Sequence, residues 1–242
     1  MKVSILIPYY GDRSSQLRRS LRFLKKQTYS DCELVVINDG SPMPNDLIDE
    51  FDVYSRIRAD GSSIRSSNRA YREAFSKSSG DFIITGHPEL LIPYDGVERM
   101  VTEANMDRRN GPTQYHLTHE MVYQLFQVRV GEWEHDFDKI KSLPGFMSTV
   151  TPWQYVNQVS HTYRNHFSFS GLTRERFARY LIPDTEEWGR EDAWTHEQEM
   201  KNGEPSVPID IEIYHQEHER VWGTITKYSV RIQRIRDSRL AG

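Results

Sequence analysis

His87 and Glu89 form the first candidate site, because an imidazole and a carboxylate lie on either side of Pro88. The proline has a fixed φ, so it stiffens the link and can hold both side chains toward one point. Such a pair suits Mn²⁺ or Mg²⁺ beside a diphosphate. A polar loop with a satisfied histidine and a solvated glutamate would show the same short motif. The rest of the chain has to separate these two interpretations.

Glu191 and Asp192 are a second candidate, since they are adjacent carboxylates that follow Trp188-Gly189 at the predicted start of a helix. First-turn acids are stabilised by the helix dipole, so a purely structural role is the alternative. Catalysis would need only one of them turned toward a cleft, where a carboxylate can take a proton from a hydroxyl.

His215 and His218 are a third candidate, at the end of an alternating strand pattern in residues 211–219. Two histidines three residues apart on an edge strand would otherwise be ordinary surface residues. A metal site becomes the better interpretation only if this strand ends close to His87 and Glu89.

A short apolar strand must position the metal pair. Residues 82–85 are aromatic or β-branched and lie between glycine-containing turns, as in an interior strand. Pro88 cannot donate to a strand ladder, so pairing should end there. Ligands of α/β sheets bind just beyond such strand ends. The sequence therefore places His87 and Glu89 at the edge of a buried sheet.

Two earlier segments repeat this pattern of an apolar strand with a polar end. They are residues 3–8 and 32–37, joined by a helix that Ser14 or Ser15 can cap, and a further helix at 64–78 leads into the strand at 82–85. Strands joined in this way are parallel, with right-handed crossovers. Their ends should share one rim of an α/β sheet, and that rim would carry Tyr9, Tyr10, Asp12, Asp39, His87 and Glu89.

The second half is less regular. We expect a helix at 93–111, a pair of strands at 113–130, a small turn at 169–173 that leads into a helix, and a strand from residue 211. Residues 131–166 have no clear period. Trp133, Trp153 and Tyr155 could stack on a sugar there, although a loop that packs its own aromatics is the favoured interpretation.

The segments around residues 5–10, 35–41 and 80–83 resemble the nucleotide-sugar half of family 2-like glycosyltransferases with the GT-A fold. The resemblance implies that Pro8 and Tyr9 lie near the nucleobase and that Asp39 binds it. Tyr10, Asp12 and Asn68 are grouped with them as donor-binding candidates. His87 and Glu89 stand where the acidic DxD motif of the family binds the metal, and His-Pro-Glu looks like its xPE variants.

A second resemblance lies on the acceptor side. Trp188-Gly189-Arg190-Glu191-Asp192, preceded by a turn at Gly171, resembles the pattern of galactosyltransferase-type members. It implies Asp192 as catalytic base, Glu191 as the group that holds a sugar, and Trp188 as a stacking ring, with Gly171 and Gly189 shaping the acceptor site. Gln198 stands near the place of the arginine usual in that pattern.

A third resemblance concerns the last metal ligand. Residues 214–217 are similar to a Tyr-His-Gln-Glu form found in chondroitin-polymerase-like members. It implies that His215 binds the metal, with His218 as the fallback.

Together these resemblances imply a mixed, mostly parallel sheet flanked by helices. One domain would cover residues 1–223, with a nucleotide-sugar half at 1–93 and an acceptor half at 94–223, and a basic tail would follow at 224–242. The implied activity is transfer of a sugar from a nucleotide sugar, expected to be a UDP-sugar, to a hydroxyl of a glycan or other acceptor, with Mn²⁺ or Mg²⁺ as cofactor. One catalytic carboxylate and direct displacement imply inversion, since no second, nucleophilic carboxylate is recognised.

Two other function classes stay open. A nucleotidyltransferase would share the sheet and the metal, but residues 9–12 do not supply the glycine-rich phosphate loop expected after its first strand. A non-catalytic nucleotide-sugar or glycan-binding module is the third possibility, because the metal motif is altered.

Composition sets the outer bounds. The chain has 242 residues, 37% hydrophobic and 27% charged, with a net charge of −4, which argues against nucleic acid as a partner. No apolar run is long enough for a membrane span, and the chain opens directly into a strand, so we expect a cytoplasmic location. The single Cys32 cannot form an internal disulfide. The basic tail is expected to dock on its own domain, with a peripheral contact to an anionic membrane or to a partner chain as the alternative.

Overall fold

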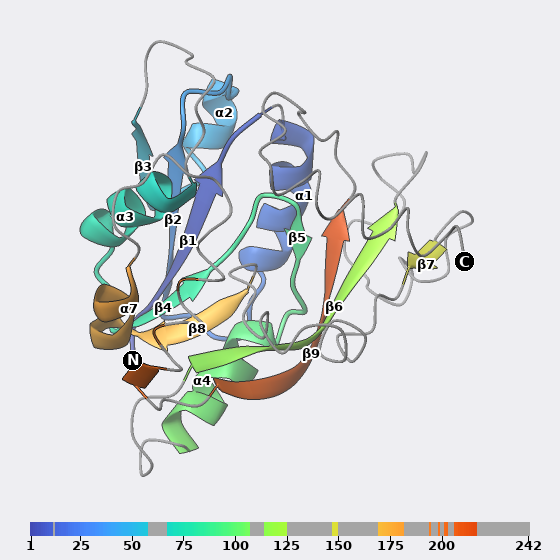
Figure 1. Cartoon of the computed structure of the whole chain (residues 1–242). Helices are drawn as coiled ribbons and strands as arrows, with labels where there is room; N and C mark the ends of the chain where they lie inside the picture. The colour runs from blue at the N-terminus through green and yellow to red at the C-terminus, as the bar shows by residue number, and fades with distance from the viewer. Residues whose placement is uncertain are drawn as a thin grey trace, which may run out of the picture.

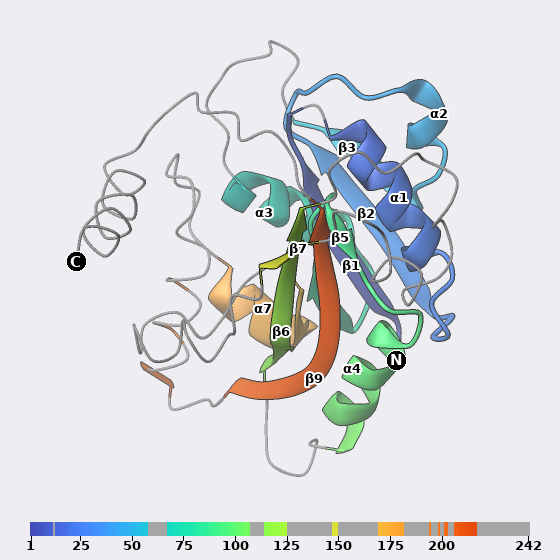
Figure 2. The same cartoon turned by 90° about the vertical axis from the view of Figure 1, so that its right-hand side faces the viewer.

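A computed structural model describes residues 1–11, 13–57, 67–106, 114–124, 147–149, 169–181, 194, 198, 201–202 and 206–216. The described strands form one mixed sheet of nine strands in the order β3-β2-β1-β4-β8-β6-β9-β5, and β7 pairs with β6. Helices α1 and α4 cover one face of this sheet and α3 and α7 cover the other (Figures 1 and 2). The fold is therefore α/β with three layers, as the sequence predicts.

The first half alternates strands and helices: β1 Val3–Tyr9, α1 Ser14–Leu24, β2 Cys32–Asn38, α2 Asn45–Ile48, β3 Val53–Arg56, α3 Ser67–Lys77, β4 Phe82–Thr85, β5 Leu90–Leu91 and α4 Gly96–Met106. The second half consists of β6 Gln114–Gln124, β7 Met147–Thr149, β8 Ser170–Thr173, α7 Arg174–Tyr180 and β9 Ser206–Gln216.

The parallel core lies at β1. Val3 pairs with Cys32 of β2 on one side and with Phe82 of β4 on the other, and both neighbours are parallel to β1. Every residue of β1 is buried, since helices cover both faces of the sheet. Strands buried on both faces are continuous apolar runs, and this explains why the sequence identified these three correctly.

The edges and the second half differ from the sequence-based expectations. The region predicted as two strands at 113–130 contains one described strand, β6, over 114–124. β9 begins at Ser206, five residues before the predicted start. Neither serine caps α1: the N-cap residue is Arg13, and no side chain makes a capping hydrogen bond.

The expected turn at 169–173 is wrong, because Ser170–Thr173 form strand β8, antiparallel to β4. A Cβ atom on Gly171 would lie 2.5 Å from the Sδ of Met100 and 2.6 Å from the ring of Phe82. Glycine is thus needed at this position for close packing of α4 and β4 against the strand. The small residues that look like a turn in the sequence belong to a central strand.

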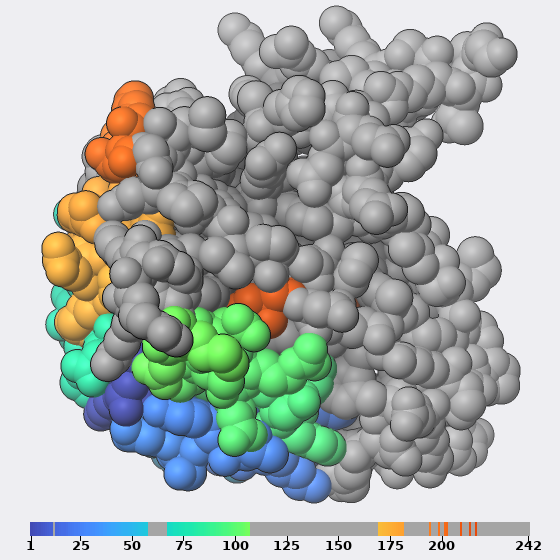
Figure 3. Space-filling model, turned by 90° about the horizontal axis from the view of Figure 1, so that it is seen from below, coloured from blue at the N-terminus to red at the C-terminus, as the bar shows by residue number. Residues whose placement is uncertain are grey.

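Side-chain contacts connect the end of α1 with the start of α4 on the face of the sheet that both helices cover. The side chain of Gln27 donates to the carbonyl of Pro93 at 2.8 Å and accepts from the amide of Val97 at 3.0 Å. Phe23 and Tyr94 stack at 5.6 Å between ring centres. In the view from below, α4 (green) borders the blue surface of the first fifty residues (Figure 3). These bonds fix the helix pair that covers one face of the sheet.

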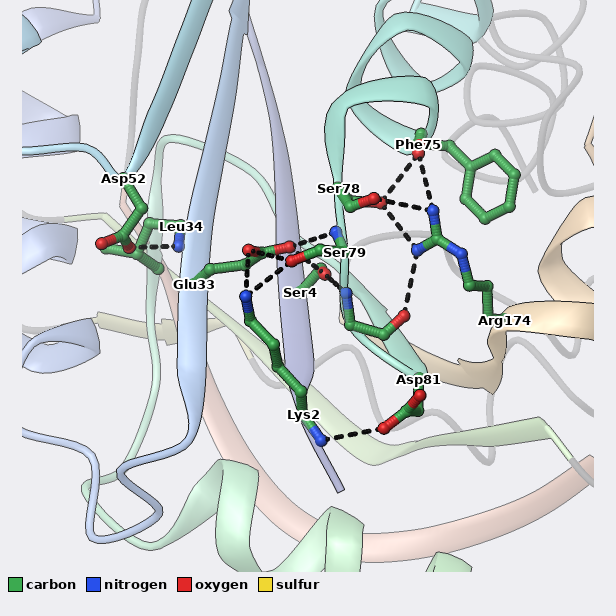
Figure 4. A network of polar contacts seen from close by, with 11 residues as sticks. Lys2, Ser4, Glu33, Leu34, Asp52, Phe75, Ser78, Ser79, Asp81 and Arg174 are labelled. Carbon is green, nitrogen blue, oxygen red and sulfur yellow. Dashed lines mark hydrogen bonds and ion pairs between the residues drawn. The ribbon is translucent and has the colours of Figure 1, made fainter.

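A polar network holds the amino ends of β1, β2 and β4 together (Figure 4). The carboxylate of Glu33 accepts from Ser4 Oγ at 2.6 Å and from Ser79 Oγ at 2.7 Å, and Lys2 Nζ lies 2.8 Å away. Burial raises the pKa of Glu33, but the hydrogen bonds from Lys2, Ser4 and Ser79 outweigh it and lower the pKa to about 2. Glu33 is therefore ionised in the folded protein.

Arg174 joins the two halves of the chain in the same region. Its guanidinium donates to the carbonyls of Ser78 at 2.7 Å and Gly80 at 3.0 Å, just beyond the end of α3 (Figure 4). It also lies 4.6 Å from the centre of the Phe75 ring. A cation at a helix C-terminus is favourable, so the start of α7 is anchored on α3.

The Glu33 network predicts a pH-dependent stability. The folded-state pKa of about 2 is below the ordinary value of 4.5, so the contribution of Glu33 should be complete above about pH 5 and fall as the pH drops toward 2. Glu33→Gln should lower the free energy of unfolding by about 1–3 kcal/mol at pH 7. Urea unfolding of both proteins from pH 7 to pH 3 should show this difference shrinking. A constant difference would contradict the assignment.

Candidate active site

The carboxyl ends of β1, β2 and β4 meet at one edge of the sheet, at the top of the core strands in Figure 1. The amide of Asp39 donates to the carbonyl of Tyr9 at 2.9 Å, and the amide of Gly11 donates to Ser41 Oγ at 2.6 Å. Gly11 and Gly40 have φ values of 72° and 90°, which favour glycine. The two turns that carry the predicted donor residues are thus joined to each other.

Asn38 and Ser41 shape the turn that carries Asp39, and the sequence analysis did not single them out. The Asn38 amide accepts from Ser41 N at 2.8 Å and donates to the carbonyl of Ser41 at 2.9 Å. Arg56 donates to the carbonyl of Gly40 at 2.7 Å. An Asn followed by Asp-Gly-Ser is a turn signal that could have revealed this role.

Of the other predicted donor residues, Tyr9 contacts the segment that follows this turn. Tyr9 is buried and its hydroxyl donates to the carbonyl of Pro42 at 3.0 Å. Pro8 pairs with Ile37 inside the sheet. Asn68 is buried in the first turn of α3, whose Tyr71 hydroxyl donates to the carbonyl of Gly86 at 3.1 Å. Asp12 lies outside the described residues.

His87 and Glu89 stand in a tight turn between β4 and β5, where the amide of Leu90 donates to the carbonyl of His87 at 3.3 Å. The Nδ1 of His87 lies 3.8 Å from Glu89 Oε1. Only 2% of the Glu89 side chain is exposed, and the same oxygen accepts from Nη1 of Arg13 at 2.8 Å. The predicted pair is therefore close together, but Glu89 also forms an ion pair with the buried Arg13.

The strand that carries His215 ends beside this turn. Leu90 of β5 pairs with His215 of β9, and the amide of Gln216 donates to the carbonyl of Glu89 at 2.9 Å. His215 is placed by its backbone alone, and His218 lies outside the described residues. The structure thus brings the two sequence-distant segments of the predicted metal site side by side.

A buried cluster on α1 holds both segments, and sequence reasoning missed it. Ser20 Oγ donates to the carbonyl of Pro88 at 2.7 Å. The Gln216 side chain donates to the carbonyl of Gln16 at 3.1 Å and to Ser20 Oγ at 3.2 Å, and it accepts from Nε of Arg19. Because Ser20 is 68 positions from Pro88 and Gln216 is 200 positions from Gln16, no local pattern could reveal these contacts.

His87 and Glu89 lie close enough together to reach one divalent ion. Ligand atoms bind Mg²⁺ at about 2.0–2.1 Å, so two of them on one ion lie no more than about 4.2 Å apart. His87 Nδ1 and Glu89 Oε1 meet this limit at 3.8 Å. Among the residues whose side chains are described, no group of three His, Cys, Asp or Glu could hold a metal. A complete site would therefore need a further ligand, such as the predicted His215.

The family model for glycosyl transferase family 2 matches residues 4–140, more than half of the chain. The chain belongs to glycosyltransferase family 2. The matched residues include the turns after β1 and β2, which carry the predicted donor residues, and the His87-Pro88-Glu89 turn. A search of curated proteins found no match.

Solved structures show the same fold as this family 2 chain. TarS of S. aureus matches with a TM-score of 0.59 and 14% identity over 90% of this chain and 37% of TarS. TarS residues 1–349 in complex with UDP-GlcNAc match with a TM-score of 0.56 and 13% identity over 91% of this chain and 60% of that one. A mannosyltransferase from Pyrobaculum calidifontis in complex with GDP-Man and Mn²⁺ matches with a TM-score of 0.59 and 14% identity over 96% and 60%. The family 2 chain spans less than two thirds of each of these proteins, and the fold is GT-A.

The predicted acceptor residues are mostly outside the part of the family 2 chain that the structure describes. This applies to Trp188, Gly189, Glu191 and Asp192, to the aromatics Trp133, Trp153 and Tyr155, and to the tail at 224–242. Gly171 is described, and its position in β8 gives it a packing role against Met100 and Phe82. Within the described residues, no helix has the length and apolarity needed to cross a bilayer.

Proposed function

We propose that this family 2 chain is a metal-dependent, inverting glycosyltransferase that moves a sugar from a nucleotide sugar to a hydroxyl of a glycan or other acceptor. The observation that carries the proposal is the common rim, where the turn of Asp39 follows β2 and the pair of His87 and Glu89 follows β4, the two strands that flank β1 and run parallel to it. Ligands of open α/β sheets bind at such strand ends. The rim would hold the base at one end and the diphosphate at the other.

The donor is expected to be a UDP-sugar, because a carboxylate at Asp39 can accept from a base N–H and the family resemblance points to uracil. The structural neighbours support nucleotide sugars as a class, since one is a complex with UDP-GlcNAc and another a complex with GDP-Man. The proposal therefore includes a nucleotide sugar as donor, with uridine as the expected nucleoside.

Each predicted residue has a role in the proposed reaction. Glu89, His87 and His215 would hold Mn²⁺ or Mg²⁺, which supplies Lewis-acid stabilisation of the leaving diphosphate when bound. Asp192 would take the proton from the acceptor hydroxyl as it attacks the anomeric carbon. Glu191 would hold a sugar and Trp188 would stack on one. Direct displacement at the anomeric carbon inverts its configuration.

Slow hydrolysis of the donor tests the function. The protein is first screened by thermal shift against UDP- and GDP-sugars with Mn²⁺, and the sugars that bind are then assayed for release of nucleoside diphosphate. We expect release that depends on the divalent cation. A protein that binds a nucleotide sugar but does not turn it over, either alone or with any acceptor tested, would instead be a binding module. Pyrophosphate release from a nucleoside triphosphate would indicate a nucleotidyltransferase.

Asp39→Ala should weaken binding of the nucleotide by about 1–3 kcal/mol, the effect of leaving a buried donor without its acceptor. Calorimetry with UDP measures this change. Asp46→Ala is the matched control, since Asp46 is an exposed partner of Arg18 on the surface and should leave affinity unchanged. Equal affinity in the Asp39 variant would remove Asp39 from the donor site.

A further inference from the structure

Arg13 is a buried cation at the point where β1 has ended and α1 begins. Only 5% of its side chain is exposed, and its Nη1 donates to Glu89 Oε1 at 2.8 Å. The guanidinium carbon lies 4.1 Å from the centre of the Tyr10 ring. A charge removed from water is unfavourable unless it is paired, so Glu89 is the group that keeps Arg13 in this position.

The guanidinium has more donors than this pairing uses. Arginine carries five N–H donors in a rigid, planar fork. Within the described part of the chain, the Nε of Arg13 is buried and has no hydrogen-bond acceptor. A buried donor without an acceptor is unfavourable, and a phosphate group offers oxygens that this fork matches. Arg13 can therefore receive a second anion.

The first turn of α1 adds positive potential at the same place. α1 has 11 residues, starts directly after Arg13, and contains no acidic residue in its first turn. The N–H groups at the start of a helix favour phosphates and other anions. The acidic neighbour in the sequence, Asp12, lies outside the described residues. Arg13 and the start of α1 thus supply positive charge from two independent sources.

In an enzyme with donor and metal bound, Arg13 and the metal ion would both be attracted to Glu89. Its Oε1 accepts from Arg13 and also lies 3.8 Å from His87 Nδ1, so the guanidinium and a cation held by His87 and Glu89 would compete for the same carboxylate. A phosphate that binds Arg13 would free Glu89 to bind the cation. A cation that binds Glu89 would likewise free Arg13 to bind the phosphate. Coupling of this kind is reciprocal, so each ligand would favour the other.

We propose that Arg13 and the start of α1 bind the diphosphate of the nucleotide sugar, and that Arg13 exchanges Glu89 for a phosphate oxygen when the donor binds. The inference rests on the proposed function and adds Arg13 to the donor site. Arg13 would then stabilise the charge on the departing nucleoside diphosphate directly. Glu89 holds Arg13 in the absence of donor.

Calorimetry in the presence of a chelator tests the exchange without relying on turnover. UDP is compared with uridine and GDP with guanosine, and the pair that wild type binds is used. The measured quantity is the ratio of the nucleoside Kd to the nucleoside diphosphate Kd, which reports the contribution of the diphosphate. Glu89→Gln is compared with the double variant Glu89→Gln/Arg13→Gln, which has neither of the two buried charges, and thermal unfolding checks that both are folded.

Glu89→Gln should keep the wild-type ratio or raise it, since Arg13 is no longer held by a carboxylate. The double variant should lower the ratio about tenfold or more relative to Glu89→Gln. Arg18→Gln in the Glu89→Gln background is the matched control. It removes the same charge from the helix that Arg13 precedes, where Arg18 pairs with Asp46 at 2.7 Å on the surface, and it should change the ratio less than about twofold.

Two results would overturn the inference. In one, the double variant keeps the ratio of Glu89→Gln; in the other, the Arg18 control loses as much as the double variant, which would indicate a general effect of charge. If wild type binds none of the four ligands with the chelator, the same ratios are measured with Mn²⁺. Wild type that then still binds none of them would contradict the proposed function itself, and the inference would fail with it.

Discussion

Replacing Asp192 by asparagine should lower the rate of sugar transfer about a hundred- to ten-thousandfold, the usual contribution of a positioned general base. Asparagine keeps the size of the side chain and most of its hydrogen bonds but cannot accept the proton of the acceptor hydroxyl. The affinity for the nucleotide sugar should stay within a few-fold, because the donor residues belong to the first half of the chain. Single-turnover transfer to a proven acceptor, together with calorimetry on the donor, measures both quantities.

Two further variants show whether the effect is specific to Asp192. Asp184→Asn is the same substitution in the same segment, outside the Trp-Gly-Arg-Glu-Asp motif, and should leave transfer unchanged. Glu191→Gln should reduce binding of a sugar as well as the rate. Transfer at a near wild-type rate by Asp192→Asn would place the base elsewhere. Equal losses of donor affinity and rate would mean that Asp192 has a structural role at the start of a helix.

Removal of divalent cations should lower donor turnover by about a hundredfold or more, since Lewis-acid stabilisation of a leaving group is worth several kcal/mol. Glu89→Gln and His215→Ala should lose the response to added Mn²⁺ in the same assay. Glu89→Gln also weakens the bond to buried Arg13, so its thermal unfolding must be measured in parallel.

Glu50→Gln is the matched control for Glu89→Gln, because Glu50 is half-exposed and pairs with Lys25 at the surface. It should keep the full response to Mn²⁺. Full activity of chelator-treated wild type, or wild-type behaviour of both the Glu89 and the His215 variants, would show that the metal assignment is wrong.

The parallel core could be predicted because its strands carry their own signal. β1, β2 and β4 are buried on both faces and are continuous apolar runs with polar ends, so the strands themselves and their common direction could be predicted. β3 was missed, since its four residues, Val53–Arg56, form an edge strand with no fully buried position. β8 was mistaken for a turn, because the reason for Gly171 is its contact with Phe82 and Met100.

In the candidate site, too, some residues could be predicted from the sequence and others could not. Asp39 and the pair of His87 and Glu89 could be placed from sequence, because each follows directly after a predictable strand. Arg13 was not identified, since only the folded chain brings it to Glu89, 76 positions away. The same limit applies to Gln216, whose side chain reaches Ser20 across 196 positions. Contacts between distant segments leave no local pattern in a single sequence.

The position of β8 between β4 and β6 determines when the nascent chain can complete its sheet. β4 ends at Thr85, but the strand that covers its second side ends at Thr173. On a ribosome that adds about 5–20 residues per second, that edge stays open for about 4–18 s. An open, apolar strand edge is a template for pairing with other chains. Chaperone binding during synthesis would therefore matter most in this interval, before Arg174 emerges to anchor α7 on α3.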